Sequence, residues 1–208
     1  TSFQNYLEQS TNNPANLQHF NNEAHIRGNK LFWHKNSPAF SANQADIDKN
    51  PKQYTKIKPI SEGALFSGRI RFENLSKVEL GALLFVLKLK DNLFHKIGMA
   101  KPLGLGSVKI TPKLFISDKK LRYSGFLTEW GNLTPSENEK EFISEFEKHI
   151  LVKLGRKDLS SLWDEARMKE LSIMLSFPKA GVQDNNVYMD LKEFRNRPIL
   201  PKPSTVAK

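Results

Sequence analysis

The stretch GALFSGRIRFENLSKVELGALLFVLKLKDNLFHKIGMAKPLGLGSVKITPKLFIS, residues 63–117, decides the fold of this chain. From Phe66 to Phe72, apolar residues alternate with polar ones, which predicts a half-buried strand over residues 65–73. The same alternation from Val108 onward predicts a second strand over residues 106–117. We expect the two strands to neighbour each other in an antiparallel sheet.

A capped helix lies between these two predicted strands. Ser76 and Glu79 fit a capping box, in which both side chains bond backbone N–H groups of the first turn. Residues 78–89 are apolar around most of the helix circumference, which indicates a buried helix. The order strand, helix, loop, strand predicts an α+β fold. The residues expected to share its core are Phe66, Ile70, Leu84, Phe85, Val108 and Ile110.

Composition divides the chain into three regions. Residues 1–24 are crowded with Asn and Gln, which predicts a polar arm or loop because such side chains bury too little apolar area to offset ordering. Residues 25–126 form the predicted α+β module, with a strand-like run at 31–33 and a polar loop over 35–56. Residues 127–208 are predicted to be a helical extension with a Pro-rich tail.

Local signals place the elements of this C-terminal region. We expect a helix over 137–154 that ends at Gly155, and another over 160–175. The prolines of residues 197–203 predict an extended tail. Residues 121–126 are a hairpin candidate, and residues 187–191 are a short strand candidate.

Charge and composition narrow the classes of partner. The chain has 208 residues, a net charge of +10 and a sequence pI near 9.7, which favours a polyanionic partner such as nucleic acid or an anionic membrane surface. Because it has no cysteine, disulfides, thiol catalysis and Cys-ligated metal sites are excluded. No apolar run approaches the roughly 20 residues of a membrane span. The first residue is not Met, so we expect a processed product or a piece of a longer protein.

The segment from His95 to Ser107 is the most informative candidate site. Gly98, Gly104 and Gly106 allow the backbone to approach a ligand closely, and exposed N–H groups of such a turn form an anion-binding concavity. Lys96 and Lys101 add positive charge. The pattern is neither a Walker A loop nor Gly-x-Gly-x-x-Gly, and a purely structural glycine turn explains it equally well.

Further basic residues belong to the predicted strands. Arg69 and Arg71 share one face of the first strand, and Lys109 and Lys113 share one face of the second. Paired with these faces together, the strands would present a basic sheet suited to a phosphate backbone. The alternative is that these four side chains are only the solvated side of the sheet. Arg27 and the Trp33–His34 pair form a second, weaker candidate for phosphate and base contacts, although Trp33 as a core residue is the simpler interpretation.

A family resemblance rests on the same residues. Ile97 to Ile110 resembles the glycine-rich loop of the RAMP proteins of CRISPR systems. Gly98-Met99-Ala100 fills its first glycine element, with Ala100 in place of a glycine, and Gly104-Leu105-Gly106 fills the second. Residues 26–34, 57–60, 71–75, 79–81 and 192–201 resemble the C-terminal part of large type III-associated RAMP proteins, so the likeness covers most of residues 25–204.

The resemblance implies a ferredoxin-like, RRM-like module in which residues 63–117 are the second half. Residues 1–62 are too polar to supply a full strand-helix-strand first half, which leaves the completeness of the module open. It implies an RNA-binding component of a CRISPR antiviral ribonucleoprotein complex that holds guide RNA through phosphate contacts. Its partners would be the guide RNA and other RAMP or effector subunits, in the cytoplasm, without a membrane or a cofactor. The resemblance implies that RNA is bound at the glycine-rich loop by Lys96, Gly98, Lys101, Gly104 and Gly106. The basic residues noted above, Arg27, Arg69, Arg71 and Lys109, complete the predicted RNA-binding set.

Two other functions stay open. A metal-independent endoribonuclease that processes guide RNA would need a general base, for which His95 and His34 are the candidates. The loop carboxylates Asp46 and Asp48 are a weaker suggestion of RNA cleavage, and no histidines share a metal-ligand spacing. Alternatively, the helices of residues 137–175 and the Pro-rich tail dock neighbouring RAMP subunits.

Overall fold

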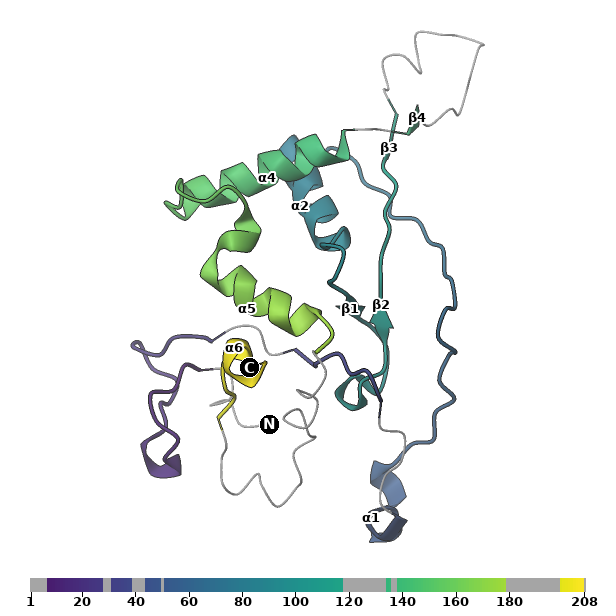
Figure 1. Ribbon diagram of the computed structural model, residues 1–208, viewed down its shortest axis with the longest axis vertical. Coiled ribbons are helices and arrows are strands. Elements are labelled where there is room, and N and C mark those ends of the chain that lie inside the picture. Colours follow the sequence, from purple (N-terminus) through teal and green to yellow (C-terminus); the bar gives the residue numbers. More distant parts are fainter. Residues whose placement is uncertain are drawn as a thin grey trace.

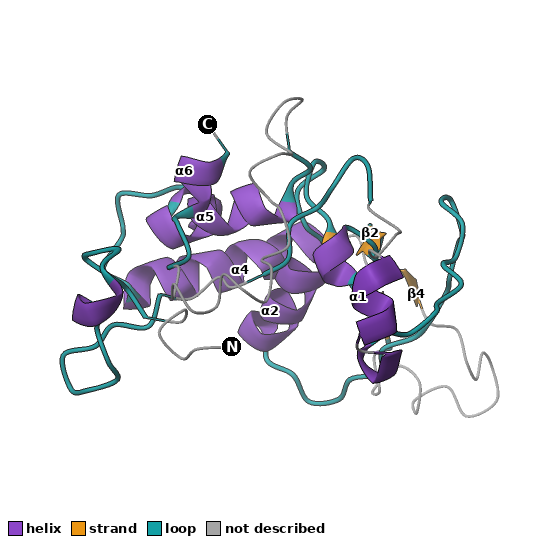
Figure 2. Ribbon diagram, turned by 90° about the horizontal axis from the view of Figure 1, so that it is seen from below, coloured by secondary structure: helices purple, strands orange, loops and turns teal. Residues whose placement is uncertain are grey.

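A computed structural model describes residues 7–27, 31–38, 44–49, 51–117, 134–135, 138–178 and 199–207. In these ranges the chain mixes helices with two small antiparallel sheets, which agrees with the predicted α+β class. Three helices, α2 (Lys77–Leu87), α4 (Glu139–Lys153) and α5 (Ala166–Leu175), gather together, while the short strands lie to one side of them (Figures 1 and 2). The predicted hairpin at 121–126 and the strand at 187–191 lie outside the described residues.

Helix α2, Lys77–Leu87, begins where the capping box predicts. The Ser76 hydroxyl accepts from the Glu79 N–H at 3.3 Å, and the Glu79 carboxylate accepts from the Ser76 N–H at 2.8 Å. Helix α4, Glu139–Lys153, packs against α2. A Cβ at Gly81 would lie 2.0 Å from the Phe142 carbonyl oxygen, so only glycine lets the two helices approach this closely.

The core is built mainly between these helices. One cluster contains Leu80, Leu84, Leu114 and Phe142, and the other contains Phe85, Leu93, Leu151, Leu162 and Trp163. The predicted burial of Leu84 and Phe85 is therefore confirmed. Phe85 stacks on Trp163 with ring centroids 5.1 Å apart.

The C-terminal helices follow their local signals with two differences. Gly155, at φ 68°, closes α4 as predicted. The helix expected over 160–175 is divided into the 3₁₀ turn η5, Leu162–Asp164, and α5, Ala166–Leu175, because Glu165 is extended and its carboxylate caps the N-terminus of α5. The tail is not extended throughout, since Pro203 begins the short helix α6, Pro203–Val206.

The strand predicted over 106–117 forms only two short pieces. Strand β2, Ser107–Val108, pairs with β1, His95–Lys96, and β3, Phe115–Ile116, pairs with β4, Thr134–Pro135. Pro112 lies between β2 and β3 and has no N–H to donate to a ladder, which explains the interruption. Ile110, predicted in the core, is exposed.

The strand predicted over 65–73, and its pairing with residues 106–117, is wrong. The segment has no ladder within the described chain, and Phe66 and Ile70 are 80% and 60% exposed instead of buried. β2 pairs with the residues just before the glycine loop instead. Alternation specifies that a strand has one apolar face, but it does not specify which segment pairs with it.

The N-terminal part contains more structure than its composition predicts. Leu7 and Leu17 are buried, Leu7 bridges Ile26, and η2, Pro14–Asn16, is a short 3₁₀ turn. The expected loop at 35–56 contains α1, Gln44–Lys49, and η3, Pro51–Gln53. The strand-like run at 31–33 forms no strand. Among the helices of the described ranges, none is long and apolar enough to cross a bilayer.

Candidate functional site

The glycine-rich loop, residues 97–106, connects β1 to β2 as a wide hairpin (Figure 1). His95 pairs with Val108 and Lys96 with Ser107, and the Ile97 N–H donates to the Gly106 carbonyl at 2.8 Å to close the base of the loop. The loop is therefore held at one end of a two-stranded sheet, as predicted. The strand that pairs with β2 is β1, however, and not residues 65–73.

Left-handed backbone angles give the loop its shape. Gly98, Gly104 and Gly106 have φ values of 82°, 103° and 77°, and Ala100 has a φ of 54°. A Cβ at Gly106 would lie only 1.9 Å from the Ile97 carbonyl oxygen, so this position requires glycine for space as well as for φ. Ala100 shows that the same angle is accepted where the resemblance expected a glycine.

The two loop lysines donate to carbonyl oxygens of the loop itself. The Lys96 ammonium donates to the carbonyls of Gly104 and Leu105 at 2.7 and 2.9 Å. The Lys101 ammonium donates to the Gly98 carbonyl at 2.6 Å. Burial, and then the neighbouring charge of Lys35, lower the pKa of Lys96 to about 8. The lysines thus brace the loop and bring positive charge to it.

Donors remain available on the same loop. An ammonium group has three N–H donors, so Lys96 keeps one and Lys101 keeps two beyond these bonds. In the described part of the chain, the backbone N–H groups of Gly98, Met99, Ala100 and Lys101 have no acceptor. By contrast, the Gly104 N–H is used, donating to the Lys101 carbonyl at 3.1 Å. The stretch 98–101 is therefore where the loop can bind an anion.

Lys35 is a member of the site that the sequence analysis missed. Its side chain lies so close to Gly104 that a Cβ there would be 2.8 Å from the Lys35 Cβ. Its ammonium has no partner among the described residues. Lys35 follows the Trp33–His34 pair directly, but no spacing in the sequence relates it to a glycine so far along the chain.

His34 supports the loop from inside. Its ring is fully buried, with Nε2 3.2 Å from the Phe94 carbonyl and Nδ1 2.7 Å from the Ser107 hydroxyl. Because a carbonyl only accepts, Nε2 carries the proton and Nδ1 accepts from Ser107. Burial and then the charge of Lys96 lower the pKa of His34 to about 4, so the ring is neutral at pH 7. His34 therefore joins the start of β1 to β2.

The other candidate residues are not brought to the loop. Arg69 and Arg71 lie on the exposed segment before α2, so the predicted basic sheet with Lys109 and Lys113 does not form. Lys109 donates to the Asp91 carbonyl at 3.0 Å. Arg27 donates to the carbonyl of Pro201, which ties the N-terminal part to the tail.

The second candidate histidine also has a structural contact. His95 is half-buried, and its Nε2 lies 3.3 Å from the Leu87 carbonyl at the end of α2. Trp33 is half-buried, and Asp48 accepts from the Gln44 amide within α1. The described residues contain no group of three or more His, Asp or Glu side chains that could hold a metal.

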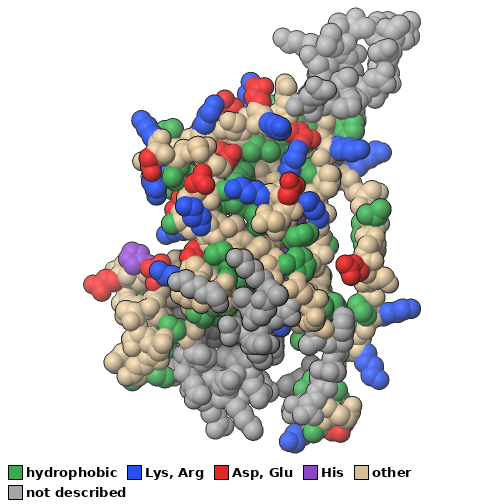
Figure 3. All heavy atoms as spheres, viewed as in Figure 1, with side chains coloured by type: hydrophobic (Ala, Val, Ile, Leu, Met, Phe, Trp, Pro, Cys, Tyr) green, Lys and Arg blue, Asp and Glu red, His purple; other side chains and the backbone are tan. Residues whose placement is uncertain are grey.

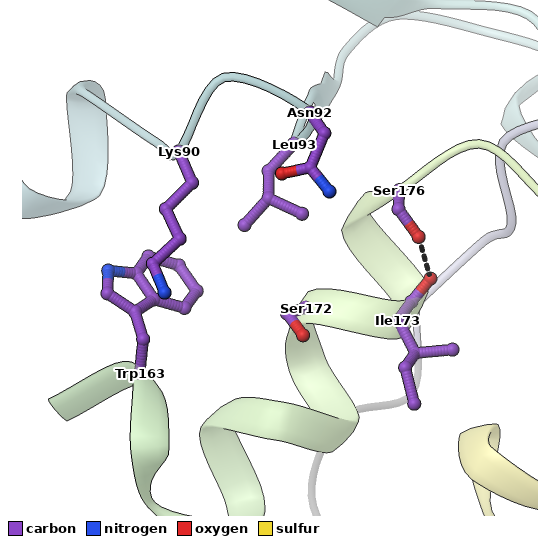
Figure 4. Close-up of a pocket in the computed structure, with 7 residues that line it drawn as sticks. All are labelled: Lys90, Asn92, Leu93, Trp163, Ser172, Ile173 and Ser176. Carbon is purple, nitrogen blue, oxygen red and sulfur yellow. Dashed lines mark hydrogen bonds between the residues drawn. The ribbon is translucent and has the colours of Figure 1, made fainter. Parts of the chain in front are cut away.

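A hollow of about 310 Å³ lies apart from the loop, between α5 and the turn before β1. In Figure 4, the Lys90 side chain extends over the face of Trp163, and Asn92, Ser172 and Ser176 point toward the same space. The Lys90 ammonium is 5.5 Å from the Trp163 ring centroid, a cation–π distance. The Ser176 hydroxyl is occupied by the Ile173 carbonyl at 2.9 Å.

Comparison with known proteins adds nothing to this geometry: no protein-family model matches the chain, and no curated protein matches it significantly.

Proposed function

We propose that the chain binds RNA through its phosphates at the glycine-rich loop. The observation that carries this proposal is a loop whose N–H groups at residues 98–101 have no acceptor in the described chain. The same loop holds the ammonium groups of Lys96 and Lys101, and the Lys35 side chain lies against it at Gly104. Backbone N–H groups and lysines together are the usual donors to phosphate oxygens, and such contacts carry no base information.

The electrostatics of the loop favour an anion over a neutral ligand. Burial, and then the charge of Lys35, lower the pKa of Lys96, and a bound phosphate would relieve the repulsion between these two ammonium groups. The chain as a whole carries +10, which attracts a polyanion over a longer range. Because Lys96 and Lys101 are already held by loop carbonyls, binding would order few additional side chains.

The resemblance to RAMP proteins suggests which RNA this is. On that basis, we propose a component of a type III-like CRISPR antiviral complex that holds guide RNA alongside other RAMP subunits in the cytoplasm. The ferredoxin-like module belongs to this proposal, with residues 63–117 as its second half. The helix, loop and β2 of that half are present in the described chain, while residues 65–73 lack a partner strand.

The contacts of the two candidate histidines favour RNA holding over RNA cleavage. A general base must reach the proton it removes, and His34 is fully buried and occupied at both ring nitrogens. His95 is half-buried against the carbonyl that ends α2. Incubating the protein with CRISPR repeat RNA without added metal tests the nuclease alternative directly, because specific cleavage would restore it.

A charge-matched pair of variants tests the RNA-binding proposal. We expect Lys35→Gln/Lys101→Gln to weaken binding of a 15-nucleotide oligouridine about tenfold or more. The slope of log affinity against log salt concentration should become shallower by about 0.7 for each lost phosphate contact. The control Lys153→Gln/Lys157→Gln removes the same charge from exposed lysines at and beyond the end of α4. Equal losses in both variants would show that the affinity comes from net charge and not from the loop.

A further inference from the structure

The segment of residues 57–75 lies along the outside of the molecule and exposes apolar side chains. It runs as a long trace between α1 and α2 in Figure 1, and Figure 3 shows hydrophobic side chains projecting from this margin between charged ones. Leu65 is 96% exposed and Phe66 is 80% exposed, and the other exposed apolar residues of the segment are Ile57, Ile60, Ile70 and Leu75. Exposed apolar side chains this close together indicate an interaction site.

The central part of this segment, residues 65–72, has no backbone partner in the described chain. Only Phe72, near the end of the segment, packs against the core cluster of Leu80, Leu84, Leu114 and Phe142. Residues 65–72 are therefore anchored at one end, and their N–H and C=O groups have no partner among the described residues, as in an edge strand that can accept another strand.

The side chains of residues 65–72 determine which side chains an added strand must present to them. Phe66, Ile70 and Phe72 alternate with Arg69 and Arg71, so in a strand these three apolar residues share one face, and the arginines share the other face with Leu65. No acidic side chain pairs with either arginine within the described chain. Opposite charges directly across two strands stabilise their pairing, and like charges oppose it.

We propose that residues 65–72 bind an extended segment of another polypeptide, in which apolar side chains alternate with Asp or Glu, by strand addition. Main-chain bonds would provide affinity, the apolar face would cover Phe66 and Ile70, and the acidic face would pair with Arg69 and Arg71. This surface is separate from the glycine-rich loop and is independent of the proposed RNA binding.

A second copy of this chain fits the segment poorly. Self-pairing centred on Arg69 places the two Arg69 side chains opposite each other, and self-pairing centred on Ile70 places Arg69 opposite Arg71. Centring on Gly68 places Arg71 opposite the apolar Leu65. RNA would satisfy the arginines but would leave Leu65 and Ile70 in water, since phosphate contacts bury little apolar area.

Hydrogen exchange with defined probes tests this proposal on the full chain. The probe is a ten-residue peptide that alternates glutamate with valine, and its controls are the same peptide with lysine in place of glutamate and a 15-nucleotide oligouridine. We expect the glutamate peptide to slow exchange of residues 65–72 at least tenfold, and to bind at least tenfold more tightly than the lysine peptide.

Two matched variants separate this site from general stickiness. Phe66→Ser should weaken the glutamate peptide about tenfold, whereas Phe20→Ser, at a side chain 75% exposed elsewhere, should not change it. Sedimentation of the protein alone tests whether a second copy of the chain binds this segment. The proposal would be overturned if oligouridine alone or self-association protected residues 65–72, or if neither peptide protected them. Equal effects of the two variants on peptide affinity would also overturn it.

Discussion

Acidification should destabilise this protein through one buried ring, that of His34. The folded state holds His34 neutral, with a pKa of about 4 against an ordinary 6.5. The unfolded chain takes up a proton at His34 as the pH falls below 6.5, whereas the folded chain does not until about pH 4. Stability contributed by the neutral ring is therefore present above pH 6.5 and is lost as the pH falls toward 4.

The size of this loss follows from the gap between the two pKa values. It corresponds to about 3 kcal/mol once the pH reaches 4, or about 6–12 °C in melting temperature for a chain of this length. Because carboxylates also titrate in this range, the informative quantity is the difference between the wild type and His34→Gln, which cannot titrate there. The variant should be less stable at pH 7, since it holds the Ser107 hydroxyl and the Phe94 carbonyl less well.

Thermal or urea unfolding of both proteins at pH 7, 6, 5 and 4.5 measures the effect. The wild type should lose about 2–3 kcal/mol more than His34→Gln between pH 7 and 4.5. His149→Gln, at an exposed position of α4, is the control and should follow the wild type. Parallel stability profiles for the wild type and His34→Gln would refute the buried, neutral state of His34.

Three further predictions concern the loop and the core. Oligouridine affinity should fall several-fold as the pH rises from 7 to 9, because Lys96, with its pKa of about 8, loses its charge. The Lys96→Arg variant stays charged over this range, so an equal fall in its affinity would contradict a role of the Lys96 charge in RNA binding. Gly106→Ala should lower the free energy of unfolding by about 2 kcal/mol or more, because the new Cβ meets backbone atoms. Gly98→Ala should lower it by about 1 kcal/mol, because no atom lies within 4 Å of the new Cβ. Equal losses in thermal unfolding would contradict the loop geometry. Phe85→Ala should cost about 3–5 kcal/mol and Phe66→Ala close to nothing, so comparable losses would contradict the positions of these side chains.

Features with a short-range cause could be predicted from the sequence. The capping box of Ser76 and Glu79 and the left-handed Gly155 are set by a few neighbouring residues, and both are confirmed. The glycines at 98, 104 and 106 likewise mark the turn where the loop changes direction. In each case the physical requirement lies within one turn of the chain.

Features that depend on distant partners could not be predicted in the same way. His34 and Ser107 are 73 positions apart, and nothing in their local sequence indicates that they meet. The alternation of residues 65–73 predicts a half-buried strand, yet the described chain supplies no strand to pair with it. The sequence predicts that Lys96 and Lys101 add positive charge to the loop, but it does not indicate that their ammonium groups donate to carbonyl oxygens of the same loop.

The central claim is that the loop N–H groups of residues 98–101 bind RNA phosphate, and the glycine amides report on it most directly. In protein labelled with ¹⁵N-glycine, a titration with oligouridine should shift the Gly98 amide strongly, since that N–H has no acceptor in the described chain. The Gly155 amide, which donates to the Val152 carbonyl at 3.1 Å at the end of α4, should stay in place. A stationary Gly98 signal at saturating RNA, or a shift of Gly155 as large as that of Gly98, would contradict the account.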